Sequence, residues 1–403
     1  MIDRRTLLKL LAAGAAAQAL PLQANASAKR VVVAGAGIVG ASIAYHLAKA
    51  GVQVTIVDTV GPASHASKGT FAWINATWAK QPRSYHTFNQ QSVADWATLS
   101  EELDIPVHWG GSIEWFESAE RQQKLAEQID EQIQWGEPAR MVPPKDFASL
   151  EPKVNFQGAS AVALSPNDGA VDPVLATQKL LAAAEAVGAV LISPCKVLNV
   201  VSKAGRMTGV VTSEGTITAD KLILATGADP EATKQLAGID IPQRSTPGVI
   251  AITKPMPPLM KHIVVAPGIH MHQRLDGRIV LGEQDGAPQN AAHAVRLKKR
   301  PTTFPNRAFA QQHFDRIMII AKKFLPEIAG AEVDGVHIGW RPLPLDGHPV
   351  LGATAAQPDV YMAIMHSGVS LAPLVGQLVA REIVEGVSLT DLADYRPDRN
   401  YKN

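Results

Sequence analysis

Apolar residues near the start of the chain follow two spacings, which together predict a strand, a helix and a second strand. The continuous apolar run 31–34 is typical of a strand buried on both faces, and residues 52–57 predict another. Between them, the pattern from Ile38 to about Ala50 has helical spacing and is closed by Gly51. This order predicts a parallel βαβ unit.

Helical spacing recurs in the middle of the chain. One predicted helix is marked by residues at three- to four-residue intervals: Ser92, Trp96, Leu99 and Leu103. A second is predicted over 173–187, because Asp172 is a good N-cap residue and Pro173 suits the first helical position.

Strand patterns dominate the later part of the chain. Residues 269–273 and 278–281 flank an Asp276-Gly277 turn and predict a β-hairpin. Nearer the C terminus, residues 360–365 predict a strand, and a last amphipathic helix is expected to run to about Val384. The chain shows no internal repeat.

Composition narrows the class of protein. The chain has 403 residues, of which 46% are hydrophobic, with 38 basic and 37 acidic side chains. Balanced charge argues against a nucleic-acid binder or a polybasic membrane-surface protein. The single cysteine, Cys195, excludes an intrachain disulfide and a cysteine metal cluster, and it is expected to be a core residue in an apolar strand. This length suggests more than one hydrophobic core.

The first 28 residues have the layout of an export signal. A charged head containing Arg4 and Arg5 precedes the mildly apolar run 10–17, and small residues suited to a signal peptidase follow. That apolar run is far shorter than the roughly 20 residues needed to span a bilayer. The paired arginines resemble a bacterial twin-arginine signal, which implies export of a folded protein to the periplasm. The alternative is an amphipathic anchor or a disordered tail.

A glycine motif joins the first strand to the first helix. It has the sequence Gly35-Ala36-Gly37-Ile38-Val39-Gly40. The first glycine permits a tight turn, the second lets the backbone approach a pyrophosphate, and the third allows close packing of helix and strand. Asp58 ends the second strand, where its carboxylate can accept hydrogen bonds from ribose hydroxyls. The motif predicts an adenine-dinucleotide site, and the carboxylate disfavours NADP.

A second signature lies at residues 216–227. A short strand enters the apolar run 221–224, which ends in the turn Ala225-Thr226-Gly227. This pattern resembles glutathione-reductase-type flavoproteins, in which it returns the chain to the FAD phosphates. The alternative is an ordinary buried strand that ends in a glycine turn.

Two C-terminal motifs extend the resemblance. They are the block 340–349, Trp-Arg-Pro-Leu-Pro-Leu-Asp-Gly-His-Pro, and the segment His366-Ser367-Gly368-Val369. Combined with the glycine motif, the Asp172-Pro173 helix entry and the Ala-Thr-Gly turn, they resemble the D-amino-acid oxidase family of flavoproteins. That family includes glycine oxidase, sarcosine oxidase and bacterial D-amino-acid dehydrogenases, and the resemblance covers nearly all of the chain after residue 28.

The resemblance implies an α/β (α+β) fold with two interleaved domains. An FAD-binding, Rossmann-like domain of the glutathione-reductase type is expected from residues 29–88, 152–235 and 336–395. An antiparallel-sheet substrate domain is expected from residues 89–151 and 236–335. FAD is the implied cofactor, expected to be bound non-covalently, although some relatives attach it to a histidine near the position of His65.

The resemblance also assigns residues to FAD. Besides the glycine motif, Asp58 and the Ala-Thr-Gly turn, these are His65, Ala66, Ser67, Val197, Gly368, Val369, Ser370 and Leu371. Backbone N–H groups of the last four are expected at the start of the final helix, where they stabilise negative charge on the flavin. The alternative for Gly368 is a plain turn glycine before a helix.

Arg341 aligns with the family arginine that binds the substrate carboxylate. A guanidinium matches a carboxylate bidentately and stays charged at any working pH. The alternative is a structural ion pair with Asp346 or another acid. The family mechanism is hydride transfer from the carbon bearing the amine to flavin N5, giving an imine that hydrolyses.

Histidines are the remaining catalytic candidates. His270 and His272 are two apart on a predicted strand and so face the same way. His272 is the one we expect to contact substrate, and the alternative is an exposed or internally hydrogen-bonded histidine. His366 precedes the flavin-facing glycine and is expected near the ring, with a strand-end histidine as the alternative. The His270 and His272 pair lacks a third metal ligand, so no metal site is predicted.

These residues predict an FAD-dependent enzyme that oxidises the C–N bond of a small amine or amino acid. Oxygen, a quinone or a redox protein is the expected electron acceptor, and neither nucleic acid nor a membrane span is expected. The alternatives are oxidation of a hydroxy acid or an opine-like secondary amine, and a non-catalytic flavin electron carrier or assembly partner.

Overall fold

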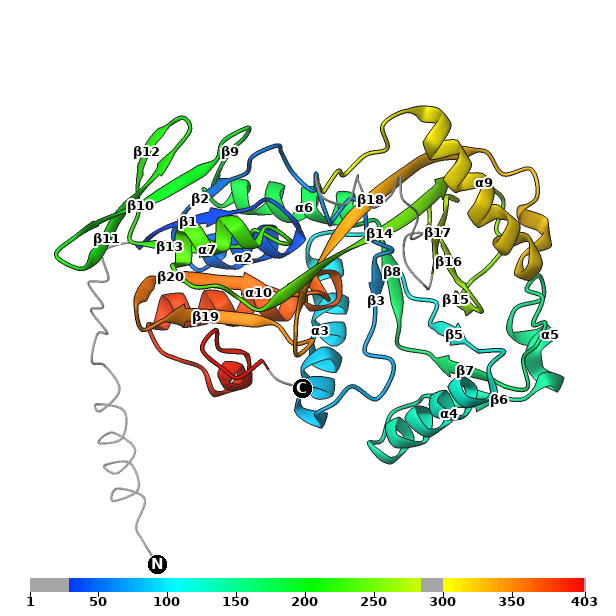
Figure 1. Ribbon diagram of the computed structural model, residues 1–403. Helices are drawn as coiled ribbons and strands as arrows, with labels where there is room; N and C mark the ends of the chain where they lie inside the picture. Colours follow the sequence, from blue (N-terminus) through cyan, green and yellow to red (C-terminus); the bar gives the residue numbers. More distant parts are fainter. Residues whose placement is uncertain (1–28, 284–299, 402–403) are drawn as a thin grey trace, which may run out of the picture.

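The computed structural model describes residues 29–283 and 300–401. Within them, strands form two large sheets and two small ones, and helices cover the large sheets (Figure 1). The protein has a mixed α/β fold, as predicted. The predicted export signal, residues 1–28, lies outside the described residues. In the two described ranges, no helix is both long enough and apolar enough to cross a membrane.

The first large sheet has six strands in the order β19-β20-β13-β1-β2-β9. All neighbours are parallel except β19 and β20, which are antiparallel. The predicted βαβ unit is confirmed as β1 (Arg30–Ala34), α2 (Ile38–Lys49) and β2 (Gln53–Val57). The other strands are β9 (Val190–Ile192), β13 (Lys221–Leu224), β19 (Val350–Thr354) and β20 (Gln357–Ile364).

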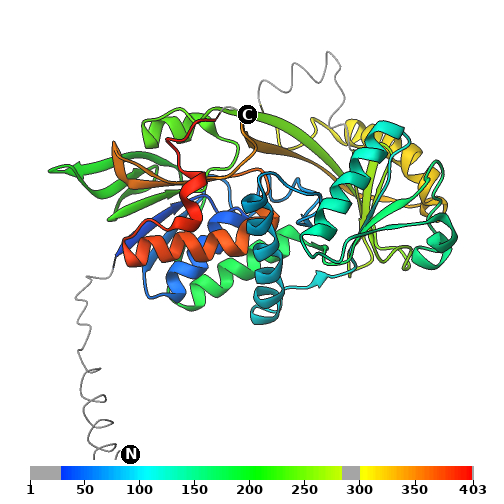
Figure 2. The same ribbon diagram turned by 90° about the horizontal axis from the view of Figure 1, so that it is seen from below.

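Alternating side chains of this sheet enter two different cores. Val31 and Val33 pack with helices α2, α6 (Pro173–Ala186) and α10 (Gly368–Glu385), which lie side by side in Figure 2. Val32 and Ala34 enter a core on the opposite face, beneath a three-stranded sheet and α7 (Pro230–Ala237). That small sheet contains β10 (Val197–Lys203), β11 (Arg206–Thr212) and β12 (Gly215–Thr218). Cys195 is buried in this core, in the loop before β10 and not in a strand as predicted.

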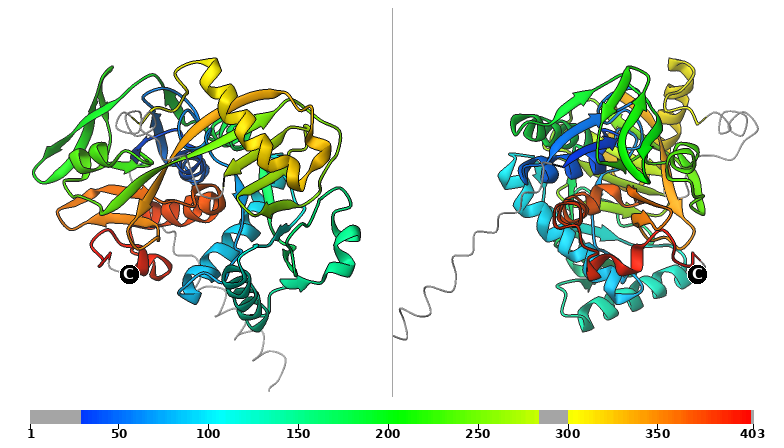
Figure 3. Two further views of the ribbon diagram at one scale, coloured as in Figure 1. Left: turned by 45° about the vertical axis from the view of Figure 1, so that its right-hand side comes forward. Right: turned by 90° about the vertical axis from the view of Figure 1, so that its left-hand side faces the viewer.

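The second large sheet has eight strands in the order β18-β14-β17-β16-β15-β5-β7-β6. Helix α9 (Arg307–Phe324) covers its outer face. The helix is yellow in the left panel of Figure 3. The predicted hairpin is confirmed as β16 (Ile269–Gln273) and β17 (Ile279–Glu283). The remaining strands are β5 (Ser112–Glu114), β6 (Arg140–Val142), β7 (Val162–Ser165), β14 (Gln243–Thr253), β15 (Ile263–Ala266) and β18 (Val333–Pro344).

Strands β14 and β18 connect the two halves of the molecule. They pair antiparallel along their whole length, from Gln243 opposite Pro344 to Thr253 opposite Val333. Figure 1 shows this ribbon running from the six-stranded sheet to the eight-stranded sheet. Arg341 therefore lies on a strand that reaches from one sheet to the other.

Shorter elements fill the space between the sheets. Strands β3 (Trp73–Ile74), β8 (Gly169–Val171) and β4 (Val107–His108) form a small sheet between the two large ones. Helix α4 (Ala119–Gln134) packs against β6 and β7, and α5 (Phe147–Leu150) follows β6. One-turn 3₁₀ helices lie at Pro144–Asp146 and Pro326–Ile328, and a longer one at Thr390–Tyr395.

Two elements belong to a different domain from the one predicted for them. Helix α3 (Arg83–Glu102) was assigned largely to the substrate domain, yet its Trp96 and Leu99 pack in the core of the six-stranded sheet. Strand β7 was assigned to the FAD domain but pairs within the eight-stranded sheet. Periodicity shows that a segment has an apolar face but not which of two cores that face meets.

Helix α10 begins at Gly368, two residues before Ser370, and it contains Pro373. Proline has no N–H to donate to the carbonyl four residues earlier. That carbonyl, of Val369, instead accepts a hydrogen bond from the Trp96 indole at 2.8 Å. The hydroxyl of Ser92 donates to the next carbonyl, of Ser370, at 2.7 Å. Two side chains of α3 thus hold the first turn of α10 in place.

Candidate active site

The glycine motif forms a tight turn at the edge of the six-stranded sheet. Gly35 has φ +118°, and a side chain there would collide with the carbonyl oxygen of Ala225. A Cβ on Gly40 would collide with the carbonyl oxygen of Gly35. Gly37 differs, because a Cβ there would meet only the Ser67 hydroxyl, at 3.2 Å. Two glycines thus close the turn, and the third leaves open space beside the amino end of α2.

Asp58 and Ser67 fix this turn from the neighbouring loop. The Asp58 carboxylate accepts a hydrogen bond from the N–H of Ala36 at 2.8 Å, and it also accepts from Val60 and Gly61. The Ser67 hydroxyl accepts from the N–H of Ile38 at 3.0 Å. Both predicted residues therefore touch the motif itself. His65 in the same loop is exposed and Ala66 is partly buried.

The second signature lies against the first. The N–H of Ala225 donates to Ala34 at the end of β1, at 2.9 Å, so the Ala-Thr-Gly turn lies beside the glycine turn. Gly227 has φ +59°, and a Cβ there would meet nothing within 4 Å. Thr226 exchanges a hydrogen bond with Thr233 at the start of α7. Val197 is buried at the start of β10, two residues after Cys195, whose N–H donates to the Asp58 carbonyl.

The amino end of α10 is the third part of the site. A Cβ on Gly368 would come within 3.0 Å of the Val39 side chain, so α10 begins directly against the first turn of α2. Neither a capping side chain nor an acidic residue occupies this first turn. Its N–H groups and the positive end of the helix dipole are therefore available to an anionic group.

These features fit FAD. The open space beside Gly37 and Gly227 could accommodate the pyrophosphate at the end of α2. Asp58 could bind the ribose, since its carboxylate stands at the end of β2 next to this space. The uncapped start of α10 could face the negatively charged edge of the flavin. The residues present are thus the donor set that a dinucleotide needs.

One face of the eight-stranded sheet carries the polar candidates. Strand pairing places six residues in one row across β5, β15, β16, β17, β14 and β18: Glu114, Val265, His270, Gly282, Ile250 and His337. Paired residues on neighbouring strands share a face. Arg341 and His272 lie on this face as well, because side chains alternate along a strand. The opposite face packs on α9.

Arg341 is half-buried and its guanidinium lies over Gly248 of β14. A Cβ on Gly248 would come within 2.8 to 3.2 Å of the guanidinium atoms. Burial lowers the pKa of Arg341, and its guanidinium makes no hydrogen bond or ion pair within residues 29–283 and 300–401. The alternative pairing with Asp346 is wrong, because Arg399 binds that carboxylate at 2.7 Å.

His270 and His272 have different surroundings. Both rings meet the Phe71 ring edge-on, with centroids 4.4 and 4.7 Å away. His272 is only 1% exposed, and its Nε2 donates to the Phe71 carbonyl at 2.9 Å. His270 is half-buried, and the charge of Arg341 acts on it. His272 is thus an internally hydrogen-bonded histidine, whereas His270 is partly exposed, and the role predicted for His272 stays a prediction.

Burial keeps these histidines neutral. It lowers the pKa of His270 to about 4, with a smaller contribution from the positive charge of Arg341. For His272 the pKa falls to about 3, through burial first and then the charge of Arg274. At neutral pH both rings are therefore uncharged.

His366 precedes the first turn of α10. Its side chain is exposed to solvent, yet surrounding protein lowers its pKa to about 4, mainly through desolvation and then through the charges of Arg341 and Lys80. His366 thus lies between the end of β20 and the start of α10, where the charge of Arg341 acts on it.

Sequence reasoning missed a cluster of buried acids, one of which, Glu114, lies on the same sheet face as His270. Asp168 is 3% exposed and accepts hydrogen bonds from Ser112, Thr77 and Trp73. Burial nevertheless raises the pKa of Asp168 to about 6. Glu114 accepts from Trp78, and burial raises its pKa to about 7. No motif marked these acids, because their partners come from several distant segments.

Lys80 was also missed, although the sequence contained a signal for it. It is the only charged residue in the stretch 69–82, among apolar and neutral neighbours. Burial lowers its pKa to about 8.

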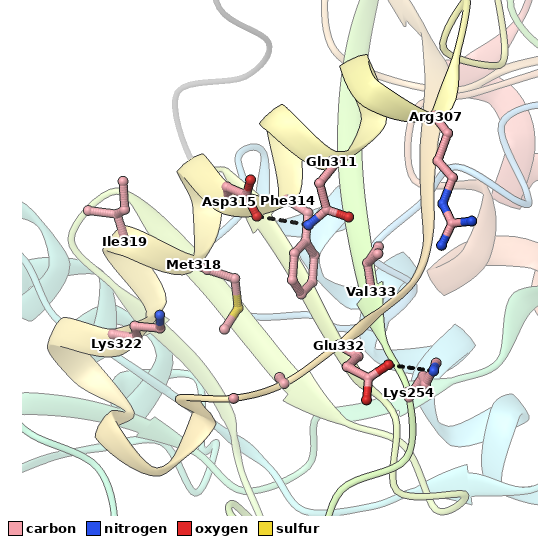
Figure 4. Close-up of a pocket in the computed structure, with 12 residues that line it drawn as sticks. Lys254, Arg307, Gln311, Phe314, Asp315, Met318, Ile319, Lys322, Glu332 and Val333 are labelled. Atoms are coloured by element: carbon pink, nitrogen blue, oxygen red, sulfur yellow. Dashed lines mark hydrogen bonds and ion pairs between the residues drawn. The ribbon is translucent and has the colours of Figure 1, made fainter.

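A separate cavity of about 570 Å³ lies under α9, away from the glycine turn (Figure 4). Phe314 and Met318 contribute apolar surface, Lys254 and Glu332 form an ion pair at one side, and Arg307 and Lys322 stand at opposite ends. None of the predicted site residues lines it. Within the described ranges, no group of three or more potential metal ligands comes together.

Comparison with known proteins agrees with the fold and the dinucleotide site. The family model for FAD dependent oxidoreductases (DAO) matches residues 30–382. Glycine oxidase of Pseudomonas putida is 25% identical, over 92% of this chain and 98% of its own length. 4-Methylaminobutanoate oxidase (formaldehyde-forming) of Paenarthrobacter nicotinovorans is 24% identical over 93% of this chain, which spans only 46% of that relative.

Solved structures share the fold. L-Proline dehydrogenase from P. horikoshii superposes with a TM-score of 0.79 at 24% identity, covering 92% of this chain and 96% of that one. Glycine oxidase from Bacillus cereus has a TM-score of 0.79 at 23% identity, covering 93% of this chain and all of that one.

Gly37→Val is expected to give folded, colourless protein. The backbone at Gly37 is extended, with φ −76°, so it accepts a side chain, but a branched one would fill the space beside α2. Flavin content of the purified variant, measured by absorbance, checks this. Gly37→Ala is the matched control and should retain more flavin. A Gly37→Val protein with full flavin occupancy would contradict the assignment.

His272→Gln is expected to reduce the loss of folding stability that acidic pH causes. The pKa of His272 is lower in the folded chain than the ordinary value of about 6.5. The contribution of His272 to the free energy of unfolding is therefore complete above pH 6.5 and declines as the pH falls. At pH 5 this loss is about 2 kcal/mol. Glutamine keeps a donor for the Phe71 carbonyl without titrating.

Denaturant unfolding of both proteins at pH 7.5 and pH 5 measures this difference, with the exposed His65→Gln as control. If wild type and His272→Gln lost the same stability between pH 7.5 and pH 5, His272 would not be held neutral by burial.

Proposed function

Because the chain belongs to the DAO family of FAD-dependent oxidoreductases, we propose that it oxidises the C–N bond of an amino acid or a related amine. The observation that carries the proposal is the Arg341 guanidinium. It is half-buried, without a partner in the described residues, and its charge acts on His270 and His366. An unpaired, partly buried cation is stabilised by an anionic ligand.

Arg341 would hold the substrate carboxylate. Its planar guanidinium presents two parallel N–H donors, which fixes both the position and the orientation of a carboxylate. The backbone of Gly248 beneath it prevents retreat toward β14, because the guanidinium already lies against that residue. The carboxylate would thus be fixed at the wall formed by β14 and β18, with the amine directed toward His366.

Neutral histidines suit an amine that reacts in its uncharged form. His270 and His366, both with pKa lowered to about 4, can accept a hydrogen bond from the amine without adding positive charge beside it. FAD, when bound, would take the hydride of the C–H bond. The nitrogen lone pair would form the C=N bond of the resulting iminium ion, and water would hydrolyse it to a carbonyl compound with release of ammonia or an amine.

The names of the relatives support this substrate class. Glycine, 4-methylaminobutanoate and L-proline each combine an amine with a carboxylate. The chain spans nearly all of the glycine oxidase but less than half of the 4-methylaminobutanoate oxidase, so any activity of the missing portion is not carried over. The unpaired guanidinium of Arg341, whose charge acts on His270 and His366, favours catalysis over a non-catalytic electron-carrier role.

Arg341→Ala is expected to retain FAD but to lose carboxylate substrates. Truncating one partner of a buried charge pair costs about 2 kcal/mol or more, which is about 30-fold or more in kcat/KM. An amine without a carboxylate should be little affected. Dye reduction and oxygen consumption with D- and L-amino acids, N-methyl amino acids and simple amines measure this and identify the acceptor.

Arg381→Ala is a matched control, since Arg381 pairs with Glu385 on the exposed side of α10. Unchanged kinetics in Arg341→Ala, or an equal loss for amines with and without a carboxylate, would refute the carboxylate-binding role.

We also propose export to the periplasm by the twin-arginine route. The support is the sequence of residues 1–28, which lie outside the described structure. Replacing Arg4 and Arg5 together by lysine should leave the protein, with its flavin, in the cytoplasm of a producing bacterium. Cell fractionation followed by activity staining tests this, and unchanged periplasmic recovery of the double variant would argue against the signal.

A further inference from the structure

Two glycines lie inside strands of the eight-stranded sheet, on the face that carries Arg341. Gly248 belongs to β14 and Gly282 to β17, and neither has a positive φ, so the backbone at both positions accepts a side chain. A glycine inside a strand weakens the sheet, because it packs no side chain and loses more conformational freedom on folding. Such a glycine often marks a place where another group approaches the backbone closely.

A polar side chain lies over each of these glycines. An added Cβ on Gly248 would come within 2.8 Å of Nη2, 3.0 Å of Nε and 3.2 Å of Cζ of Arg341, so the guanidinium lies across this position. A Cβ on Gly282 would come within 2.4 Å of Nε2 and 2.6 Å of Cδ2 of His270. Alanine at either position would therefore push the side chain above it away from the sheet.

The two side chains lean toward each other across the sheet. Arg341 on β18 reaches over β14, His270 on β16 reaches over β17, and β14 and β17 are neighbours. Gly282 pairs with Ile250, so Gly248 is its diagonal neighbour on the same face, about 7–8 Å away. Two hydrogen bonds of about 3 Å each, with a small ligand between them, span such a gap.

Phe71 limits where the histidine can move. Its ring meets the His270 ring edge-on, with centroids 4.4 Å apart, and it also packs against the apolar cluster that contains Ile250. A His270 ring displaced from the sheet cannot move sideways into Phe71. It would therefore rise into the gap that faces Arg341.

Packing on the glycines sets the height of both polar groups above the sheet. Within residues 29–283 and 300–401, neither the Arg341 guanidinium nor the His270 ring makes a hydrogen bond. A hydrogen bond to protein would fix such a group, and here the contact with Gly248 or Gly282 takes that role.

We propose that Gly248 and Gly282 are positioning residues, which set the height at which Arg341 and His270 meet the substrate. The inference rests on the proposed function, in which Arg341 holds the carboxylate and His270 contacts the amine. A reacting group held about 1 Å out of place can lower the rate by about 100-fold. Alanine at Gly248 would displace the carboxylate, whereas alanine at Gly282 would displace the group that contacts the amine.

Gly248→Ala is expected to lower kcat/KM for amino acids by about 10- to 100-fold and to leave amines without a carboxylate within about twofold. Gly282→Ala should lower kcat/KM for both kinds of substrate, since both carry the amine. Gly335→Ala is the matched control on β18, because a Cβ there would come within 2.8 Å of the His337 ring. This control should leave both kinds of substrate within about twofold.

A double-mutant cycle separates positioning from a general loss of structure. If Gly248 acts through the guanidinium, Gly248→Ala should add at most about twofold to the effect of Arg341→Ala. Gly282→Ala should likewise add little to His270→Ala. Flavin content and denaturant unfolding check that each variant folds, which we expect because the colliding atoms are the ends of side chains.

A full further loss in the double variants would overturn the inference, and so would an equal loss for amines with and without a carboxylate in Gly248→Ala. If a variant fails to fold, a crystal structure of the wild-type holoenzyme with acetate gives a second test. Acetate is expected over Gly248 against the Arg341 guanidinium, and acetate bound only elsewhere would contradict the inference. Failure of the proposed function looks different, since the wild type would then oxidise no amine.

Discussion

The site depends on the close packing of α2 against the glycine turn that follows β1 in the six-stranded sheet. Gly40 has no side chain, so the helix lies directly against the Gly35 carbonyl, and Ala225 closes the same turn from β13. Any larger residue at Gly35 or Gly40 would separate helix and strand. The amino end of α2 can therefore reach the edge of the sheet, where a dinucleotide phosphate would lie.

The position of α10 follows from that of α2. Gly376 lets the two helices touch, because a Cβ there would collide with the Ser42 hydroxyl, and Ser42 in turn donates to the Ala372 carbonyl at 2.7 Å. Gly368 then begins α10 beside Val39. Two helix amino ends are thus placed on one side of the sheet, and both offer N–H groups to a single negatively charged cofactor.

The strand that carries Arg341 is positioned by a contact between two backbones. Gly69 lies against Gly339 so closely that a Cβ on either residue would overlap the other chain. This contact attaches the loop that follows Asp58 to β18, two residues before Arg341. The loop after Asp58 and the strand that carries Arg341 are therefore fixed relative to each other by two glycines. Both glycines adjoin segments that the sequence marked, but the contact between them joins residues 270 positions apart and leaves no local signal.

The sequence predicted most of the helices, strands and turns that depend on residues close together in the chain. The βαβ unit, the Asp172-capped helix and the hairpin at Gly277 depend on neighbouring residues, and their bounds agree with the structure to within a few residues. The core to which α3 belongs, the different surroundings of His270 and His272, and the buried acids Asp168 and Glu114 depend on partners far along the chain. Such contacts leave no periodic signal, so only the fold could show them.

The central claim is that this flavoprotein oxidises amines that it holds by a carboxylate. Anaerobic mixing of the holoenzyme with amino acids, and with the amines that lack the carboxylate, tests it most directly, since it needs no electron acceptor. The account predicts that the visible flavin absorbance bleaches rapidly with at least one amino acid and much more slowly with its decarboxylated counterpart. Bleaching by neither, or by both at the same rate, would contradict it.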